Sequence, residues 1–287
     1  MKLIITKDNL LKALQKIIGV VEKRQSMPIL SHVLVRKIDG QFEVVASDLE
    51  VQLSSKIKFD SEENFAEDIT IPGRKLFDIG KGLPDDAVIE IEKKDEGKLQ
   101  IESKKSKFTL SVLDAKTFPM MENLDEASTE ITLNSSDVKD VINKTAFAMA
   151  QQDVRYYLNG LFIKIANNDL IGVATDGHRL AKAGTSIDTP AENELSAIVP
   201  RKGVIEIDKQ IEEDKKLKVV ISKNHMQVES GEATAITKLI DGKFPDYEKV
   251  IPKDSDKTIT VDCKTFKEAL IRVSILSNDR FRGVRLN

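Results

Sequence analysis

The stretch VATDGHRLA at residues 173–181 decides the fold, because the chain contains a second version of it. The counterpart is VASDLEVQL at residues 45–53, and in both stretches an apolar pair leads through a hydroxyl residue to an aspartate. The two start 128 positions apart, and Leu30 and Leu158 keep the same offset. The chain is therefore built on an internal repeat, which constrains every other inference about its fold.

The repeat begins a third time near the end of the sequence. ITVDCKTF at residues 259–266 matches ITLNSSDV at residues 131–138, again 128 positions earlier. The sequence stops at Asn287, which leaves the third copy much shorter than the other two. We interpret the chain as a fragment with two complete domains and an incomplete third. The expected domains are residues 1–124, 125–252 and 253–287.

The hydrophobic periodicity of each copy indicates an α+β fold. A short strand precedes an amphipathic helix, three alternating strands follow, and the same order is then repeated. In the first copy, the alternation at 29–36 predicts the first of those three strands. Half a copy cannot bury both of its sides alone, so we expect paired halves with the helices on one face of antiparallel sheets. The predicted helices are 7–18, 74–82, 135–150, 201–209 and 264–272.

Composition narrows the class of protein further. The single cysteine, Cys263, excludes an internal disulfide and is typical of a reducing compartment. No apolar run approaches the ~20 residues that a membrane-spanning helix needs, and the N-terminus lacks a secretory signal. We therefore expect a cytoplasmic protein with no membrane partner. One cysteine and three scattered histidines show no metal-ligand spacing, so no metal or cofactor is predicted.

Charge is distributed unevenly between the predicted helices and the rest of the chain. The five helices carry 14 basic and 7 acidic side chains, which leaves a charge of −10 elsewhere in a chain of net charge −3. Helices that face a polyanion would show this distribution, although lysine and arginine are also common on solvated helices. The first explanation predicts that the basic helix residues converge on one surface. These residues are Lys12, Lys75, Lys81, Arg201, Lys202 and Lys209.

Asp176 and His178 suggest a catalytic site in which the carboxylate orients a base. The first copy carries Glu50 where His178 stands, and the other histidines, His32 and His225, have no counterparts in the repeat. A nucleotide-processing enzyme is therefore an alternative interpretation, and it needs a third polar group close to the pair.

Basic pairs stand at two predicted helix N-termini, residues 74–75 and 201–202. Positive charge at that end opposes the helix dipole, so its repetition favours a bound anion nearby. A second unusual stretch, QQDVRYYLNG at residues 151–160, places Tyr156 and Tyr157 side by side in a loop. Exposed loop tyrosines can stack on bases or bond phosphates, which again indicates a nucleic-acid partner.

Six motifs in this order resemble the bacterial DNA polymerase III β subunit family, the β sliding clamps. They are MPIL at 27–30, RYYLNG at 155–160, ATDGHRLA at 174–181, VPRKG at 199–203, FPDY at 244–247 and FRGVR at 281–285. The resemblance runs along the whole sequence and implies tandem clamp domains without catalytic activity. It also implies a homodimer, joined head to tail into a ring that encircles duplex DNA and tethers the replicative polymerase.

The resemblance implies two binding sites. The positions that would contact DNA are Arg24, Gln152, Tyr156, Tyr157, Arg201 and Lys202, and the repeated basic pair adds Arg74 and Lys75. A pocket would take short peptides from the DNA polymerase III catalytic subunit, the clamp loader, other polymerases and repair proteins. Its lining would be Leu158, Thr175, Gly177, His178, Arg179, Leu180, Pro245 and Val250.

The incomplete third copy bears on the ring that the resemblance implies. One pocket wall and one side of the subunit seam would be missing, so we expect this chain not to close a ring. Besides the enzyme that would use Asp176 and His178, a repeat scaffold without a DNA role is a further alternative. In a scaffold, the basic side chains of the helices would share no common face.

Overall fold

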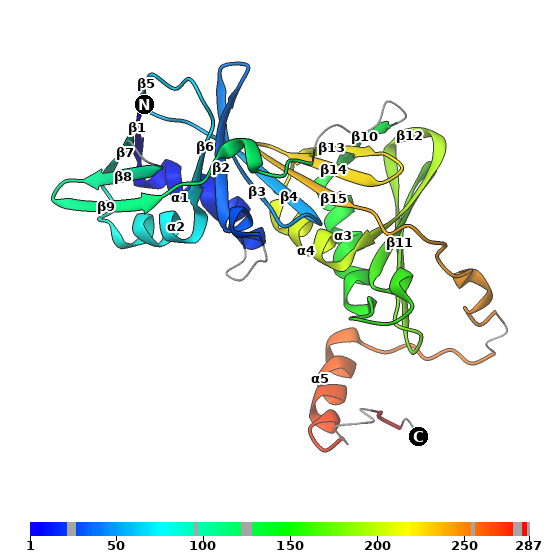
Figure 1. Cartoon of the computed structure of the whole chain (residues 1–287). Helices are drawn as coiled ribbons and strands as arrows, with labels where there is room; N and C mark the ends of the chain where they lie inside the picture. Colours follow the sequence, from blue (N-terminus) through cyan, green and yellow to red (C-terminus); the bar gives the residue numbers. More distant parts are fainter. Residues whose placement is uncertain (22–26, 95–96, 122–127, 254–255, 278–282, 286–287) are drawn as a thin grey trace. The chain divides into compact units, whose positions relative to one another are not determined.

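The computed structural model describes residues 1–21, 27–94, 97–121, 128–253, 256–277 and 283–285 (Figure 1). The chain divides into two compact units, Met1–Phe244 and Pro245–Asn287. Its α-helices are α1 Lys7–Ile17, α2 Gly73–Gly82, α3 Ser135–Thr145 and α4 Arg201–Gln210 in the first unit, and α5 Cys263–Ser274 in the second. None of these helices is long and apolar enough to cross a membrane.

The strands of the described residues lie in the first unit and follow the order expected from the repeat. They are β1 Lys2–Thr6, β2 His32–Ile38, β3 Gln41–Ser47, β4 Val51–Ile57, β5 Ser61–Glu63, β6 Ile69–Pro72, β7 Val88–Lys94, β8 Lys98–Ser103, β9 Ser106–Ser111, β10 Thr129–Asn134, β11 Gly160–Thr175, β12 Leu180–Pro200, β13 Lys216–Ile221, β14 His225–Ser230 and β15 Ala233–Lys238. The 3-10 turns are η1 Ile18–Val20, η2 Pro28–Ser31, η3 Ala115–Thr117, η4 Ala146–Ala148, η5 Tyr156–Leu158 and η6 Tyr247–Lys249.

The two halves of the first repeat exchange their first strands. β1 precedes α1 in sequence, yet it pairs with β7 of the other half, in a sheet of order β5-β1-β7-β8-β9. β6 precedes α2 and pairs with β2 of the first half. Each half therefore completes the sheet of the other, as expected if half a copy cannot bury both of its sides alone.

The second repeat continues the sheet of the first. β4 pairs with β15 from Thr237 opposite Val51 to Ala233 opposite Ser55, which gives the order β10-β13-β14-β15-β4-β3-β2-β6. Side chains along this ladder, such as Ser55 and Thr237, are buried. The main-chain bonds across the boundary therefore fix the first repeat against the second.

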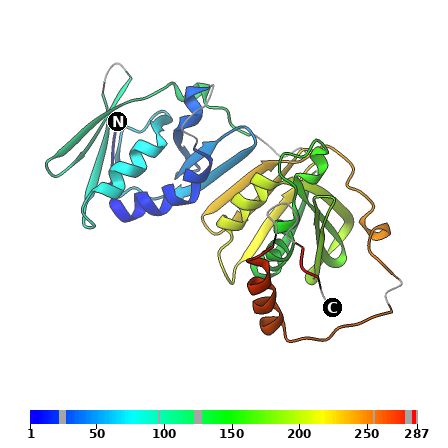
Figure 2. The ribbon, with the colours of Figure 1, turned by 90° about the horizontal axis from the view of Figure 1, so that it is seen from below.

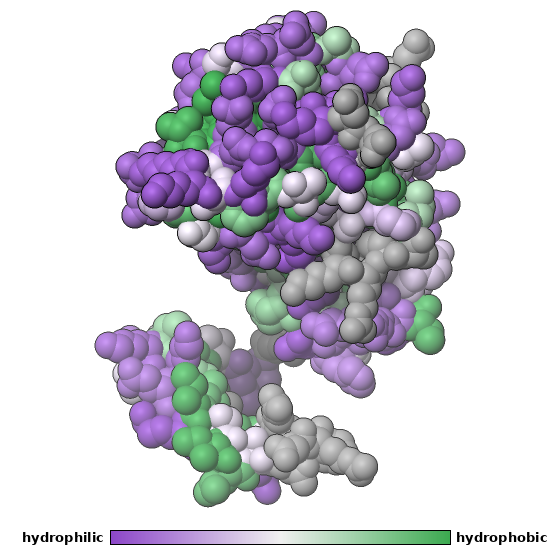
Figure 3. Space-filling model, turned by 60° about the vertical axis from the view of Figure 1, so that its left-hand side comes forward, coloured by the Kyte–Doolittle hydropathy of each residue, from purple (hydrophilic) through white to green (hydrophobic). Residues whose placement is uncertain are grey.

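The helices of the first unit lie on one side of its sheets (Figures 1 and 2), as the sequence predicts. α1 buries Leu10, Ala13, Leu14 and Ile17 at helical spacing, and its N-cap Thr6 accepts the main-chain N–H of Asn9. α5 differs, because none of its residues is buried and the side chains of Ile275 and Leu276 just after it are exposed. Figure 3 shows hydrophobic side chains gathered on the surface of this smaller unit.

Two predicted elements have different limits in the structure. The strand expected from residue 29 begins only at His32, because Pro28 opens the turn η2 and directs Ile29 and Leu30 into a small apolar cluster with Phe118. The helix expected over 135–150 ends at Thr145, whose hydroxyl donates to the carbonyl of Val141 at 2.6 Å. The turn η4 follows it.

Gly172 of β11 lies where α3 packs closely against the strand. A Cβ on Gly172 would overlap Cγ1 of Val141, whereas a Cβ on Gly184 of β12 would meet its nearest atom, Cγ1 of Ile171, at 3.4 Å. Gly172→Ala should therefore destabilise the fold by about 1–3 kcal/mol through overpacking, and Gly184→Ala should be close to neutral. Thermal unfolding of both variants checks this. Equal melting temperatures for the two variants would contradict the packing described.

Candidate functional site

Residues predicted to contact DNA surround one hollow in the second repeat. The hollow, about 930 Å³ in volume, lies between the turn η5 and the start of α4 and is lined by Gln152, Tyr156, Arg201 and Lys202, among others. Tyr156 is 56% exposed, and its ring meets that of Tyr157 edge-on at 5.8 Å. The structure thus brings the tyrosine loop and the basic helix start together, although some 40 residues separate them in sequence.

Arg201 is held at the rim of this hollow by main-chain carbonyls. Its Nη1 donates to the carbonyl oxygens of Ala146 and Met149, at 3.5 and 3.3 Å. These carbonyls belong to η4 and the residue after it, where the helical segment from α3 ends, and the Ala146 carbonyl also accepts the N–H of Met149 at 3.3 Å. The guanidinium is therefore oriented before any ligand binds, and it is only half-buried.

Lys202 points toward the first repeat. Its ammonium forms an ion pair with Asp48, whose side chain is only 3% exposed, while the lysine side chain is 35% exposed. Asp48 lies in the turn between β3 and β4. A lysine predicted to contact DNA thus has a buried carboxylate partner in the neighbouring repeat.

Arg74 and Lys75, two further positions predicted to contact DNA, are not among the residues that line that hollow. Arg24 falls outside the residues that the structure describes. Nε of Arg74 donates to the carbonyl of Val21 at 2.7 Å, so Arg74 fastens the end of the first helical segment. Lys75 is exposed near His32, whose pKa is lowered by burial and, to a smaller extent, by the positive charge of Lys75.

Two of the helix lysines form ion pairs with acidic side chains of the protein. Lys12 and Lys209 line a hollow of about 390 Å³ between α1 and α4. Lys12 pairs with Glu232 at 3.2 Å, and Lys209 with Glu206 at 2.8 Å. The net positive charge of the helices is therefore partly neutralised inside the protein. The Lys12 pair is exposed on both sides and therefore weak, so phosphate groups could compete for Lys12, whereas the Glu206 side chain that pairs with Lys209 is only 7% exposed.

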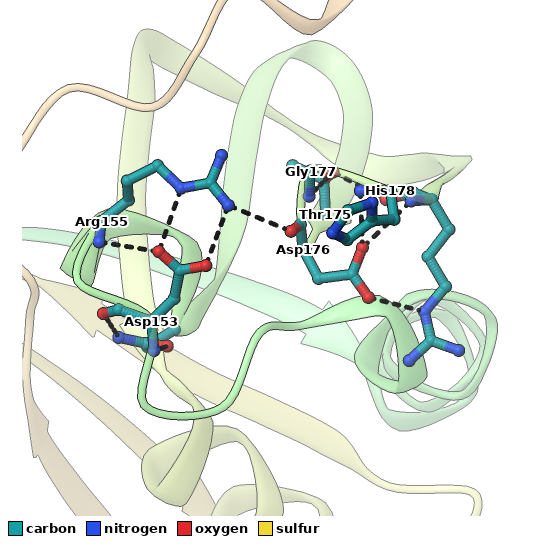
Figure 4. A network of polar contacts seen from close by, with 8 residues as sticks. Asp153, Arg155, Thr175, Asp176, Gly177 and His178 are labelled. Carbon is teal, nitrogen blue, oxygen red and sulfur yellow. Dashed lines mark hydrogen bonds and ion pairs between the residues drawn. The ribbon is translucent and has the colours of Figure 1, made fainter. Parts of the chain in front are cut away.

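The turn after β11 is held by hydrogen bonds from its own backbone (Figure 4). Oδ1 of Asp176 accepts the N–H groups of His178 and Arg179 at 2.9 and 3.0 Å, and its Oδ2 accepts Nε of Arg179 at 3.1 Å. Thr175 accepts the N–H of Gly177, which adopts a positive φ of 86° that favours glycine. Both carboxylate oxygens of Asp176 thus serve to shape the turn.

Arg155 links this turn to the tyrosine loop, a role that sequence reasoning missed (Figure 4). Its Nε and Nη2 donate to the two carboxylate oxygens of Asp153 at 3.0 and 2.8 Å, and Nη2 also reaches the carbonyl of Asp176 at 3.2 Å. The guanidinium lies so close to Gly177 that a Cβ there would stand 2.9 Å from it. The spacing of Asp153 and Arg155 could have indicated the first contact, but nothing in the sequence indicates the second.

The hydrogen bonding of Asp176 argues against the enzyme alternative, because backbone N–H groups and Nε of Arg179 occupy its carboxylate oxygens. Burial raises the pKa of this carboxyl, but the N–H groups of His178 and Arg179 outweigh burial and lower it. The carboxylate binds backbone N–H groups and Arg179, and the ring of His178 is exposed. Among the described residues, no group of three or more His, Cys, Asp or Glu side chains could hold a metal ion.

Five of the residues predicted to line the peptide pocket belong to this turn and its flanks, and a sixth, Leu158, ends the turn η5. Leu158 is buried, Thr175 and Leu180 are half-buried, and Gly177, His178 and Arg179 are exposed. Arg179 reaches further, since its Nη2 donates to the carbonyl of Phe147 at 2.8 Å and its guanidinium lies over the ring of Phe147. Pro245 and Val250 belong to the second unit, in which both side chains are exposed.

Asp153 should report the contact with Arg155 as a function of pH. The hydrogen bond from the Arg155 side chain, together with the N–H of Arg155, lowers the pKa of Asp153 from 3.8 to about 2. Because the pKa is depressed in the folded state, this contact contributes stability above about pH 4 and loses it as the pH falls through about 2. In Arg155→Ala, the pKa of Asp153 should return toward 3.8, as measured by NMR titration of the carboxyl carbon.

The matched control for that titration is Arg179→Ala, which removes a guanidinium bound to Asp176 but not to Asp153. This variant should leave the pKa of Asp153 close to its value in the unmodified chain. An equal rise in both variants would show that general loss of positive charge, and not the paired hydrogen bonds, sets the pKa.

Comparison with known proteins identifies the family. Models of the three domains of the DNA polymerase III β subunit match the chain in order, with the N-terminal domain at residues 1–122, the central domain at 132–246 and the C-terminal domain at 248–287. The β sliding clamp of Pseudomonas putida is 44% identical over 283 residues, which cover 98% of this chain and 76% of the relative. That of Escherichia coli K12 is 40% identical over 289 residues, covering 100% and 77% of the two chains.

Solved structures agree with the sequence matches. The DnaN sliding clamp of Pseudomonas aeruginosa bound to griselimycin matches with a TM-score of 0.92 at 41% identity, over 98% of this chain and 76% of that one. A DNA polymerase sliding clamp from Bacillus subtilis matches with a TM-score of 0.89 at 28% identity, over 97% and 75%. The chain therefore belongs to the DNA polymerase III β subunit family and is a sliding clamp, a processivity factor without catalytic activity.

Proposed function

We propose that this clamp encircles double-stranded DNA and tethers the catalytic subunit of DNA polymerase III to it. The observation that carries the proposal is the hollow lined by Gln152, Tyr156 and Arg201, on a chain of the sliding-clamp family. In this proposal it acts in the cytoplasm during DNA replication, and its domains are residues 1–124, 125–252 and 253–287.

The chemistry around that hollow suits a sliding contact. A guanidinium and a phenol can bond phosphate oxygens without reading base edges, so binding is independent of sequence. Such contacts depend strongly on salt, because each phosphate that is neutralised releases counterions. In this proposal, the positions that contact DNA are Arg24, Arg74, Lys75, Gln152, Tyr156, Tyr157 and Arg201. The family resemblance adds Lys202, whose ammonium is paired with Asp48.

A second surface would dock partner proteins. Thr175 and Leu180 supply apolar atoms beside the polar groups of the Asp176 turn, and Leu158 of η5 is buried. Aliphatic walls with a few polar groups suit a short peptide that carries Leu or Phe anchors. The remaining residues of this proposed site in the first unit are Gly177, His178 and Arg179, and the predicted residues Pro245 and Val250 belong to the second unit. Its ligands would be peptides of the polymerase, the clamp loader, other polymerases and repair proteins.

A head-to-tail homodimer is the assembly that we propose for the full-length protein. Ile275 and Leu276 expose 75% and 93% of their surface, which is unusual for large apolar side chains. β9 is the last strand of its sheet, so one of its edges has no neighbouring strand in that sheet. An exposed apolar segment and an open strand edge are both features that a second copy could cover.

Arg201→Ala tests the DNA surface. Removing one phosphate contact should weaken binding to linear duplexes of different sequence to a similar degree and reduce the slope of log affinity against log salt by about 0.9. Fluorescence anisotropy over a series of salt concentrations measures both quantities. Lys98→Ala, at an exposed position of β8, is the matched control and should change neither. If neither Arg201→Ala nor Tyr156→Ala weakened binding, a scaffold without a DNA role would be favoured.

Leu180→Ala tests the peptide surface. Loss of apolar contact to a leucine side chain is worth about 1–2 kcal/mol, which corresponds to a loss of affinity of roughly 5- to 30-fold. Calorimetric titration with a short peptide that carries Leu and Phe anchors measures the effect. Val88→Ala removes an exposed apolar side chain from β7 and should leave the affinity unchanged. Equal losses in the two variants would place the peptide elsewhere.

A further inference from the structure

The turn that carries Asp176 has a close structural copy in the first repeat. Oδ1 of Asp48 accepts the N–H groups of Glu50 and Val51 at 2.9 and 2.8 Å, just as Oδ1 of Asp176 accepts those of the second and third residues after it. The residue after each aspartate adopts a positive φ, 75° at Leu49 and 86° at Gly177. The two turns therefore share one geometry, and in each the Oδ2 of the aspartate is paired with a basic group.

The basic group differs between the two copies. In the second repeat, Oδ2 of Asp176 accepts Nε of Arg179 from the same turn, and the arginine side chain is 58% exposed. In the first repeat, Oδ2 of Asp48 is paired with Lys202, which comes from α4 of the neighbouring repeat. The cation paired with the aspartate thus comes from the neighbouring repeat in the first turn, whereas in the second turn it comes from the turn itself.

Other contacts from the second repeat cover the same turn. The N–H of Lys238 donates to the carbonyl of Glu50 at 3.0 Å, directly beyond the β4–β15 ladder. Gly203 of α4 packs against Thr237 so closely that a Cβ there would overlap its side chain. The backbone of α4 next to Lys202 is therefore fixed relative to β15, and β15 is fixed relative to the turn.

We propose that Lys202 is a positioning residue that locks the second repeat onto the Asp48 turn, and that it is not one of the phosphate contacts. Turning Lys202 toward DNA would leave the Asp48 carboxylate, almost fully enclosed, without its cation. A buried charge that loses its partner is strongly destabilising, whereas DNA offers a lysine only solvent-exposed phosphates. Arg201, which is anchored by carbonyl groups, remains the phosphate contact at this helix start. This inference rests on the proposed DNA surface.

The first test is a thermal double-mutant cycle on the full chain, with Lys202→Ala, Asp48→Asn and the double variant. Each single change should lower the melting temperature by about 5 °C or more, and the double variant should melt no lower than the less stable single variant, because the two residues act as one contact. Lys144→Ala, which removes an exposed pair with Asp140 on α3, should leave the melting temperature almost unchanged. If the two single losses of melting temperature added up in the double variant, Lys202 and Asp48 would not form one contact and the proposal would be wrong.

The second test separates positioning from phosphate contact. Lys202→Met keeps the aliphatic part of the side chain, and its binding to a linear duplex is measured over a range of salt concentrations beside Arg201→Ala. The salt slope of Lys202→Met should equal that of the unmodified chain, while Arg201→Ala should lose about 0.9. A loss of about 0.9 in Lys202→Met would overturn the proposal, whatever its melting temperature. An unchanged salt slope in Arg201→Ala would instead reject the proposed DNA surface. The thermal double-mutant cycle would then still test whether Lys202 and Asp48 hold the two repeats together.

Discussion

The rest of the first unit depends on the exchange of first strands between half-repeats. β1 pairs with the sheet of β7 to β9, and β6 pairs with the sheet of β2 to β4. Without the other half, each half of the first repeat would therefore have a strand edge with unpaired main-chain groups. A buried edge with unpaired N–H and C=O groups is costly, so the halves must fold together. The helices then have only one place to bury their apolar faces, against the paired sheets. One-sided placement of helices follows from the pairing of strands.

The ladder between β4 and β15 extends this constraint to both repeats and sets the chemistry of their boundary. It brings α1 against α4, where Lys16 pairs with Glu212 at 2.9 Å and Nε2 of Gln210 donates to the carbonyl of Lys16 at 2.6 Å. Part of the positive charge of the helices is therefore neutralised by ion pairs between the two repeats. The charge that remains for a polyanion is diffuse, which suits a protein that must move along DNA without stopping at a particular sequence.

Most of the fold could be predicted from the sequence, because helices and strands leave local periodicities and the repeat doubles each signal. The offset of 128 residues is sufficient by itself to align Asp48 with Asp176. Strand exchange, the β4–β15 ladder and the Lys202–Asp48 pair were not predicted, because each depends on pairing between distant segments and has no local pattern. The same limit applies to Arg155, whose contact with the Asp176 carbonyl spans 21 residues and has no sequence signature.

The two aspartate turns show how a duplicated element can serve different purposes. A left-handed φ costs a residue with a side chain roughly 1–2 kcal/mol, and Leu49 bears this cost in the first copy while Gly177 avoids it in the second. The first turn can tolerate the strain because Lys202 and Lys238 hold it from outside. The second turn depends chiefly on its own hydrogen bonds and on Arg155, so glycine lets it keep the same shape while His178 and Arg179 stay exposed. A turn held by contacts from a neighbouring repeat can be strained and serve as a joint, whereas a turn that depends on its own hydrogen bonds is best built without strain.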